Sequence, residues 1–276
     1  MIATSPSLLN TNQTTLKPAV YIIGAGPGDP ELLTVKAAKI LNQTDVLLYA
    51  DSLVPKEMLA LLKSDCEIIH TSNKTLEEVL PVMMDRVRSQ QSVVRLHSGD
   101  PCLYGAVHEQ MNALAKAEVP FEVIPGISAF QLAAAKLNVE LTVPELVQSI
   151  ILTRISGRTQ VPDAEELSGL AAHKASLCLY LSARHVENAQ AKLMEHYDAD
   201  MPIAICYRLG WPDEKIVVVP LSDMASATHN ENLIRTTMYL ITPALGKGIP
   251  NSHRRSRLYH PEHDHLFRPK TKKERK

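Results

Sequence analysis

Short apolar runs recur along the chain, each bounded by Gly, Pro, Asp or Asn and each followed by a stretch with helical spacing. This alternation is typical of an α/β protein with a mostly parallel sheet. In the first half of the chain it predicts a five-stranded sheet. The strands are expected at Val20–Gly24, Val46–Tyr49, Glu67–His70, Val93–His97 and Phe121–Ile124, and the helices at Glu31–Asn42, Pro55–Lys63, Leu76–Gln90, Tyr104–Ala117 and Ser128–Leu137.

A second α/β set follows the segment Asn138–Gln148, which has neither helical nor strand spacing and is interpreted as a linker. In this set Pro202–Tyr207 and Lys215–Val219 lie close together and predict an antiparallel hairpin, so the second sheet is expected to be mixed. The other strands are expected at Ser149–Arg154, Ser176–Leu181 and Thr237–Thr242, and the helices at Ala164–Ala172, His185–His196 and Leu221–Ala227.

The length of 276 residues predicts two domains. We expect an N-terminal α/β domain at 18–140 and a C-terminal α/β domain at 141–246. Residues 1–17 are rich in Ser, Thr and Asn and are interpreted as a flexible extension. Residues 247–276 hold ten Lys and Arg against three Asp and Glu, which indicates a solvated tail or a basic arm that reaches an anionic substrate or a partner subunit.

Composition and charge argue against several classes of protein. The 29 basic and 30 acidic residues nearly balance, so no overall field favours nucleic acid. The four cysteines have no metal-ligand spacing, which argues against a zinc site or a disulfide scaffold and fits a reducing cytoplasm. No stretch has the layout of a signal peptide or the ~18 apolar residues of a membrane span. We expect a cytoplasmic protein with no metal and no membrane or nucleic-acid partner.

The first chemical signal is the turn Gly24–Asp29, which directly follows the first strand. Its glycines permit a ligand to approach the backbone at the start of a helix. A phosphate is disfavoured, because Pro27 lacks an N–H donor and Asp29 stands where the dinucleotide fingerprint has its third glycine. Asp51 lies where a ribose-binding acid belongs, so a dinucleotide oxidoreductase stays open, as does a turn that binds nothing.

Two further strand ends carry similar turns. Ser98–Pro101 follows the fourth strand, and Pro125–Ala129 follows the fifth. Because the carboxyl ends of parallel strands share one edge of a sheet, the three turns predict a single crevice. Asp100 is expected either to contact the ligand or to cap a helix, and Ser128 to cap a helix or line the crevice. The residues expected around it are Gly99, Asp100, Leu103, Tyr104 and Ser128.

These turns, GAGPGDPELLT, RLHSGDPCLYGA and VIPGISA, resemble those of the tetrapyrrole (corrin/porphyrin) methylase family in order and spacing. The similarity runs from about Val20 to Leu245. The segments LYADSLVP, LTVPE, ILTRISGRT and YRLGWPDE resemble the branch of the family that methylates C11 of precorrin-4 or cobalt-precorrin-4. The resemblance implies a homodimer of two-domain α/β subunits, with S-adenosylmethionine in a cleft between the domains, a tetrapyrrole substrate and S-adenosylhomocysteine as product.

The resemblance also assigns cofactor contacts. In the N-terminal half it matches Pro27, the turn Ser98–Asp100 with Leu103, and the pair Ser128–Ala129. In the second half the matching cofactor-binding residues are Leu181, Leu209, Pro243, Ala244 and Leu245. Because a sulfonium methyl group is already an activated electrophile, the protein has mainly to align the substrate carbon and exclude water.

The substrate side of the site needs basic and titratable groups. Arg154, Arg158 and Arg208 are expected to bind substrate carboxylates, for which planar guanidinium groups are suited, or else to be surface residues. Asp51 is the predicted catalytic residue, although it stands where the C11 branch more usually has Gly, and Ala50 stands where uroporphyrinogen methylases have an acid. Other candidate proton acceptors are Asp100 and His97.

Three histidines and several related activities stay open. His70, His97 and His108 are expected to be structural or to meet a metal at the centre of the substrate. The alternative activities are methylation of another tetrapyrrole position, as in uroporphyrinogen III or precorrin-2/3, or of a protein histidine, as in diphthine synthase.

Overall fold

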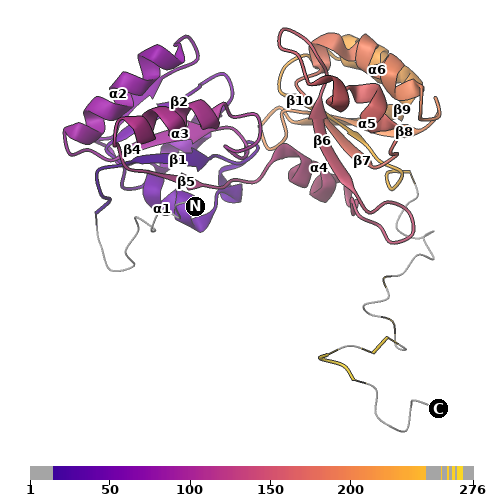
Figure 1. Cartoon of the computed structure of the whole chain (residues 1–276), viewed down its shortest axis with the longest axis horizontal. Coiled ribbons are helices and arrows are strands. Elements are labelled where there is room, and N and C mark those ends of the chain that lie inside the picture. The colour runs from indigo at the N-terminus through magenta and orange to yellow at the C-terminus, as the bar shows by residue number, and fades with distance from the viewer. Residues whose placement is uncertain (1–14, 247–255, 257–259, 261–262, 265, 270–276) are drawn as a thin grey trace. The chain divides into compact units, whose positions relative to one another are not determined.

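The computed structural model describes residues 15–246, 256, 260, 263–264 and 266–269 (Figure 1). The chain divides into two compact units, one of Met1–Ala135 with Cys206–Ile216 and the other of Lys136–Ile205 with Val217–Lys276. The expected extension at 1–17 and the basic tail at 247–276 lie largely outside the described residues. Leu16, at the end of that extension, packs against the core of the first unit. The domain limits 18–140 and 141–246 stay a prediction.

The first unit contains a five-stranded parallel sheet in the order β3-β2-β4-β1-β5. Most of its strand residues are buried, so the strands appear in the sequence as continuous apolar runs. The register aligns Tyr49 with both His70 and Leu96, which makes the carboxyl ends of three neighbouring strands flush. The strands are β1 (Val20–Gly24), β2 (Val46–Tyr49), β3 (Glu67–His70), β4 (Val93–His97) and β5 (Phe121–Ile124).

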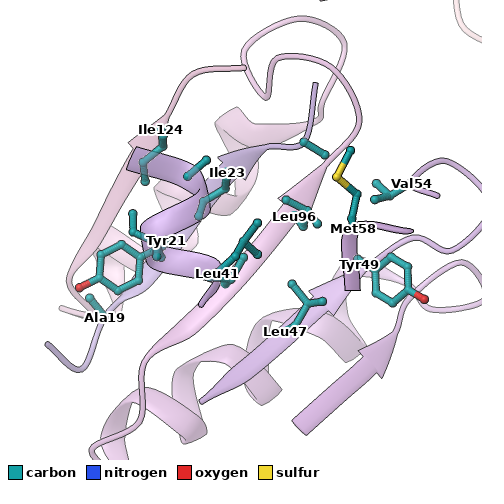
Figure 2. Close-up of a cluster of buried hydrophobic side chains, with 14 residues drawn as sticks. Ala19, Tyr21, Ile23, Leu41, Leu47, Tyr49, Val54, Met58, Leu96 and Ile124 are labelled. Atoms are coloured by element: carbon teal, nitrogen blue, oxygen red, sulfur yellow. The ribbon is translucent and has the colours of Figure 1, made fainter. Parts of the chain in front are cut away.

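Helices cover both faces of this sheet. Figure 2 shows one face, where Tyr21, Ile23, Leu47 and Leu96 of the strands pack with Leu41 and other residues of α1. On the other face, residues of α2 and α3 pack against the alternate positions of β1, β2 and β4. The helices of the unit are η1 (Pro30–Leu32), α1 (Val35–Leu41), η2 (Lys56–Leu61), α2 (Leu76–Arg88), α3 (Val107–Lys116) and α4 (Ala129–Leu137), of which α4 runs across the division between the units.

The centre of the sheet is a topological switch point. Strands β1 and β4 are neighbours, but the chain leaves β1 toward α1 on one face and leaves β4 toward α3 on the other. In open α/β sheets ligands bind outside the carboxyl ends of the strands at such a point. The fold therefore directs attention to the turns that follow β1 and β4.

The second unit contains a mixed five-stranded sheet in the order β6-β7-β10-β8-β9. Strands β6 and β7 are parallel, whereas β7 and β10 are antiparallel, which confirms the expected mixed sheet. The strands are β6 (Ile150–Arg154), β7 (Ser176–Tyr180), β8 (Pro202–Tyr207), β9 (Lys215–Pro220) and β10 (Thr237–Ile241). The helices are η3 (Asp163–Glu165), α5 (Leu167–Ala171), η4 (Ala183–His185), α6 (Val186–Met194), η5 (Leu221–Asp223) and α7 (Met224–Asn230).

Some helices begin later than the sequence pattern predicts. The expected helix Glu31–Asn42 is a short 3-10 turn followed by α1, because the Thr34 hydroxyl accepts a hydrogen bond from the N–H of Ala37 and starts a new helix there. The expected helix Tyr104–Ala117 begins at Val107, because Tyr104 and Ala106 have left-handed backbone conformations, with φ of 57° and 50°. The expected helix Pro55–Lys63 is the 3-10 helix η2.

Candidate active site

The turns after β1, β4 and β5 touch through glycines. A Cβ built on Gly24 would lie 2.6 Å from the Cα of Gly126 and 2.6 Å from the carbonyl oxygen of Gly99. A Cβ on Gly126 would lie 2.3 Å from the same oxygen. Any side chain at Gly24 or Gly126 would push the turns apart. The predicted meeting of the three turns at one edge of the sheet is therefore present in the structure.

Backbone hydrogen bonds join the first two turns. Gly26 donates to the carbonyl of Gly99 at 3.2 Å, and Gly99 donates back to Gly26 at 2.8 Å. Both glycines have positive φ, 75° and 66°, which side-chain-bearing residues adopt at a cost. The Ala25 N–H donates to the His97 carbonyl at 2.7 Å and continues the pairing of β1 with β4 past the strand ends. The two turns form one rigid platform.

Asp100 ties the second turn to the third. One carboxylate oxygen accepts the N–H of Cys102 at 2.8 Å, and the other accepts the N–H of Gly126 at 3.0 Å. Hydrogen bonds from backbone N–H groups to a carboxylate are charge-assisted and stronger than neutral ones. The side chain therefore acts as a clamp between the turns, a role that neither of the two sequence interpretations included.

The platform is open on one side. A Cβ on Gly99 would meet only the Cα of Ser128, at 3.9 Å, in contrast to the crowding at Gly24 and Gly126. Ser128 is buried, and its N–H donates to the side chain of Gln131 at 2.8 Å, so the start of α4 is fixed. The predicted lining residues that stand at this turn are Ser98 and Leu103, both partly buried, Ala129, also partly buried, and Tyr104, which is 44% exposed.

The turn after β1 has no cradle for a phosphate. Pro27 is buried and has no N–H, and the Asp29 carboxylate accepts the N–H of Glu31 at 2.9 Å, as its position at the helix start predicts. Gly28 is covered, because a Cβ there would lie 2.5 Å from the Trp211 ring and 2.8 Å from the Leu209 carbonyl oxygen. These contacts argue against a diphosphate and therefore against a dinucleotide cofactor.

The segment Cys206–Ile216, which the sequence placed in the second domain, groups with the first unit. Its Gly210 packs on the turn after β1, where a Cβ would lie 2.6 Å from the N of Asp29. Arg208 stacks on Trp211, with its guanidinium carbon 3.8 Å from the ring centroid, and its Nε donates to Asp213 at 2.7 Å. These contacts shape the segment, and the binding of a substrate carboxylate by Arg208 stays a prediction.

In the second unit, Arg154 is also engaged within the protein. Its guanidinium donates to the carbonyl oxygens of Thr159 and Gln160, each at 2.9 Å, and closes the loop that follows β6. The loop places Arg158 at an exposed position. In the part of the chain that the structure describes, no hydrogen bond or ion pair of the Arg158 side chain is found. Of the two predicted arginines in this unit, Arg158 is the one whose guanidinium is available to a ligand.

The loops after β6 and β7 lie together. The Ser182 hydroxyl accepts the N–H of Ile155 at 3.1 Å, and a Cβ on Gly157 would lie 2.6 Å from Nε2 of His185. Arg184 is exposed between these two residues of the β7 loop. Sequence reasoning did not single out Arg184, although its position just after a buried strand was a usable signal.

The structure does not bring the predicted cofactor contacts of the second unit together. Leu181 follows β7, is 66% exposed and has a φ of 53°. The turn Pro243–Leu245 follows β10, which runs antiparallel to β7 with Ile241 opposite Leu177. Thr242 accordingly lies at the start of β7, where its hydroxyl is 2.8 Å from that of Ser176. Leu181 and the turn Pro243–Leu245 therefore lie at opposite edges of the sheet.

The candidate proton acceptors differ sharply in exposure. His97 is buried, and burial together with the charge of Arg95 lowers its pKa to about 3. Asp51 is exposed, and a hydrogen bond from Ser72, with a further contribution from the charge of His70, lowers its pKa. Its carboxylate lies 3.9 Å from Nδ1 of His70. Asp51 and His70 are therefore accessible, whereas His97 is not.

Fold and turns together define an α/β protein in which three glycine turns meet at the carboxyl edge of a parallel sheet. Residues 19–225 match the model of the Tetrapyrrole (Corrin/Porphyrin) Methylases, and the chain belongs to this family. Among its relatives, the cobalt-precorrin-4 C(11)-methyltransferase of Priestia megaterium is 43% identical over 92% of this chain and 99% of the relative. The precorrin-4 C(11)-methyltransferase of Pseudomonas aeruginosa is 40% identical over 91% of this chain and 98% of the relative.

Solved structures give the same result. The X-ray structure of a cobalt precorrin-4 methyltransferase has a TM-score of 0.80 and 43% identity, and the match covers 83% of this chain and 96% of that chain. The uroporphyrin-III C-methyltransferase of Thermus thermophilus in complex with S-adenosylhomocysteine has a TM-score of 0.66 and 27% identity, over 83% of this chain and 93% of that chain. The prediction of a tetrapyrrole methylase fold is confirmed.

Proposed function

We propose that this protein transfers a methyl group from S-adenosylmethionine to C11 of precorrin-4 or of its cobalt-containing form. The observation that carries the proposal is the glycine platform, in which Gly24, Gly99 and Gly126 bring three turns into contact and leave Gly99 open on one side. Relatives at 43% and 40% identity over nearly their whole length bear names of this activity. The alternative ring positions and diphthine synthase have less support from similarity.

The platform fits S-adenosylmethionine better than a nucleotide diphosphate. A carboxylate and backbone carbonyls dominate it, and Pro27 offers no donor, so a positively charged sulfonium is favoured over a phosphate. The open side of Gly99 lets a ligand approach the backbone closely. We propose that the protein holds the methyl donor with Pro27, Ser98, Gly99, Leu103, Ser128 and Ala129, and that Tyr104 borders the site.

The bound donor supplies an activated methyl group. The protein's own contribution is to align the substrate carbon with it and to keep water out, and alignment of this kind can lower a barrier by about 7–11 kcal/mol. Rigid turns suit this task, because the backbone hydrogen bonds between Gly26 and Gly99 and the N–H of Gly126 donated to the Asp100 carboxylate fix their geometry before any ligand binds.

We propose that Arg158 and Arg184 bind carboxylates of the tetrapyrrole. Both are exposed, on loops that contact each other after the parallel strands β6 and β7. Guanidinium groups bind carboxylates through paired hydrogen bonds. Arg154 supports this role indirectly, because its hydrogen bonds hold the loop that carries Arg158.

We propose that the protein acts as a homodimer in the cytoplasm, as the resemblance to its family implies. No helix in the described part of the chain is long and apolar enough to cross a membrane. All four cysteines are free. Sedimentation of the purified chain at two concentrations tests the dimer: a mass of one subunit at both would contradict it.

A methyl-transfer assay tests the activity directly. Purified protein is incubated with S-adenosylmethionine and with either metal-free or cobalt-containing precorrin-4. Mass spectrometry is expected to show the gain of one methyl group, and ¹³C NMR with a labelled donor is expected to place it on C11. Transfer to another ring carbon, or no transfer to either substrate, would contradict the proposal.

A further inference from the structure

We propose that His70 accepts the proton that the tetrapyrrole loses when it is methylated, and that Asp51 is its positioning residue. The inference rests on the proposed function and adds to it the residue that removes the proton. The sequence predicts Asp51 as the catalytic residue, without a partner for it. The structure adds an imidazole beside it, at the end of the neighbouring strand.

The pair stands at the same edge of the sheet as the glycine platform. His70 ends β3 and lies opposite Tyr49 of β2, which in turn lies opposite Leu96 of β4. Since neighbouring strands are about 4.8 Å apart, the backbone of His70 is roughly 10 Å from that of Leu96, shortly before the turn at Ser98–Pro101. A macrocycle of four pyrrole rings bridges such a distance, so a substrate beside the platform reaches His70.

The contacts of the pair prepare it for proton transfer. Nδ1 of His70 lies 3.9 Å from the Asp51 carboxylate, and the Tyr49 ring lies behind the imidazole with a centroid distance of 5.1 Å. The two side chains are 56% and 45% exposed, which leaves Nε2 of His70 open to a substrate. A distance of 3.9 Å is longer than a hydrogen bond, and catalytic hydrogen bonds are often long before substrate binds.

Asp51 and Arg95 are the charged groups near His70. A hydrogen bond from Ser72 lowers the pKa of Asp51, so its carboxylate is ionised at neutral pH and is an acceptor for the Nδ1–H of His70. The guanidinium of Arg95, on β4, donates to the hydroxyl of Thr71, the residue that follows His70. Asp51 is the charged group for which a direct contact with the imidazole is found among the described residues.

The other candidate proton acceptors are either buried or hydrogen-bonded within the protein. Nε2 of His97 is buried with no hydrogen-bond partner among the described residues, so no substrate proton reaches it. Both oxygens of Asp100 accept backbone N–H groups. His108 lies in the first turn of α3, and its Nε2 is engaged 3.0 Å from the Asn112 amide.

The step balances without a further reactant. The π electrons of the pyrrole ring form the new C–C bond to the methyl group, while the electrons of the broken S–C bond return to sulfur. The ring is left with one positive charge shared with its nitrogen. Transfer of the nitrogen-bound proton to Nε2 of His70 restores a neutral ring and gives an imidazolium beside Asp51. Water then takes the proton.

An NMR measurement of the imidazole tautomer tests the pair without any turnover. The protein is labelled with ¹³C in its histidine rings, and the His70 signal is assigned by its absence in His70→Asn. The Asp51→Ala variant removes the acceptor that faces Nδ1, so the neutral imidazole is expected to carry its proton on Nδ1 less often than in the unsubstituted protein. An unchanged tautomer would overturn the positioning role of Asp51.

Kinetics test the proton acceptor. In single-turnover methyl transfer, His70→Asn is expected to lower kcat about 100-fold, at the lower end of what general bases contribute. His70→Ala is expected to regain activity with added imidazole, and Asp51→Ala to lower kcat with KM unchanged, because the imidazole loses the group that orients it. The control is His229→Asn, which removes a similarly exposed histidine paired with Glu187 at 2.7 Å on α7 and α6, and it should leave kcat unchanged.

Three outcomes separate this inference from the proposed function. A His70→Asn variant with full kcat, or with only a raised KM, would overturn the role of His70 while methyl transfer by the unsubstituted protein still supports the function. Loss of kcat in His70→Ala without rescue by imidazole would assign His70 a structural role. No methyl transfer by the unsubstituted protein would overturn the function itself, and the tautomer measurement would still report the contact of Asp51 with His70.

Discussion

Gly126 leaves no room for a methyl group, because a Cβ there would lie 2.3 Å from the carbonyl oxygen of Gly99. We expect Gly126→Ala to lower the free energy of unfolding by about 1–3 kcal/mol, as overpacking does. The displaced turn should also weaken binding of S-adenosylhomocysteine at least roughly tenfold, or about 1.4 kcal/mol. Urea unfolding and calorimetric titration measure the two effects.

Gly169 provides the matched control for this substitution. It lies in α5, and a Cβ there would meet nothing within 4 Å. Gly169→Ala is expected to stabilise the protein by about 0.5–1 kcal/mol, because alanine loses less conformational freedom in a helix. If both variants bound S-adenosylhomocysteine like the unsubstituted protein, the close contact of the turns would have no part in binding.

The clamping role of Asp100 can be tested by a substitution that keeps its shape and removes its charge. Asp100→Asn keeps one oxygen acceptor and places an NH₂ group opposite a backbone N–H of Cys102 or Gly126. The unsatisfied donor should cost about 1–3 kcal/mol of stability and loosen the second turn from the third. Hydrogen exchange at the Gly126 amide is expected to speed up. Unchanged exchange at that amide would show that the clamp is not formed in solution.

Residue types were easier to predict from the sequence than residue roles. Gly99 was predicted as a site residue because a glycine after a strand has few other uses. Arg154 and Arg208 were expected to bind substrate, but the structure engages them with loop carbonyls and with Asp213. Such partners depend on how a loop closes, which no spacing of residues shows. The contact of Asp51 with His70 likewise depends on the register between two strands.

At the scale of elements, Arg154 and Arg158 have different roles in the loop after β6. Arg154→Ala removes two hydrogen bonds that close the loop, to Thr159 and Gln160, and is expected to speed hydrogen exchange across residues 155–160. Because the loop carries Arg158, KM for the tetrapyrrole should rise as well. Unaltered exchange in the loop would show that Arg154 has no structural role.

Arg158→Ala serves as the paired variant. Its side chain is exposed, so the loop should keep its exchange rates while KM for the tetrapyrrole rises roughly tenfold, the loss of about one charge-assisted hydrogen bond. Affinity for S-adenosylhomocysteine should stay the same. A normal KM in this variant would remove Arg158 from the substrate site.

Strands were predicted more accurately than helix starts, for a physical reason. A strand buried on both faces, such as β1 or β2, is apolar throughout and ends near turn-forming residues. The start of α3 depends instead on two left-handed residues, Tyr104 and Ala106, that neither their type nor their spacing reveals. The placement of Cys206–Ile216 with the first unit depends on the packing of turns that lie far apart in the sequence.

For the whole molecule, His97 links stability to pH. Burial and the charge of Arg95 lower its pKa to about 3, against about 6.5 in an unfolded chain. Because the folded pKa is the lower one, this contribution to stability is fully present above about pH 6.5 and is lost as the pH falls toward 3. The free energy of unfolding should therefore decrease by up to about 1.4 kcal/mol per pH unit in this window from His97 alone.

Urea unfolding at several pH values checks this dependence. The variant His97→Gln has no group that titrates there, so its stability should fall less steeply between about pH 6.5 and 3 than that of the unsubstituted protein. An equal slope in both proteins would show that His97 is accessible to protons in the folded state.

The central claim is that the glycine turns after β1, β4 and β5 hold the methyl donor. A crystal structure of the protein with S-adenosylhomocysteine tests it most directly. The account predicts the ligand against the open side of Gly99, in contact with the backbone near Pro27 and Ser128. Density for the ligand at a place that none of the three turns reaches would contradict it.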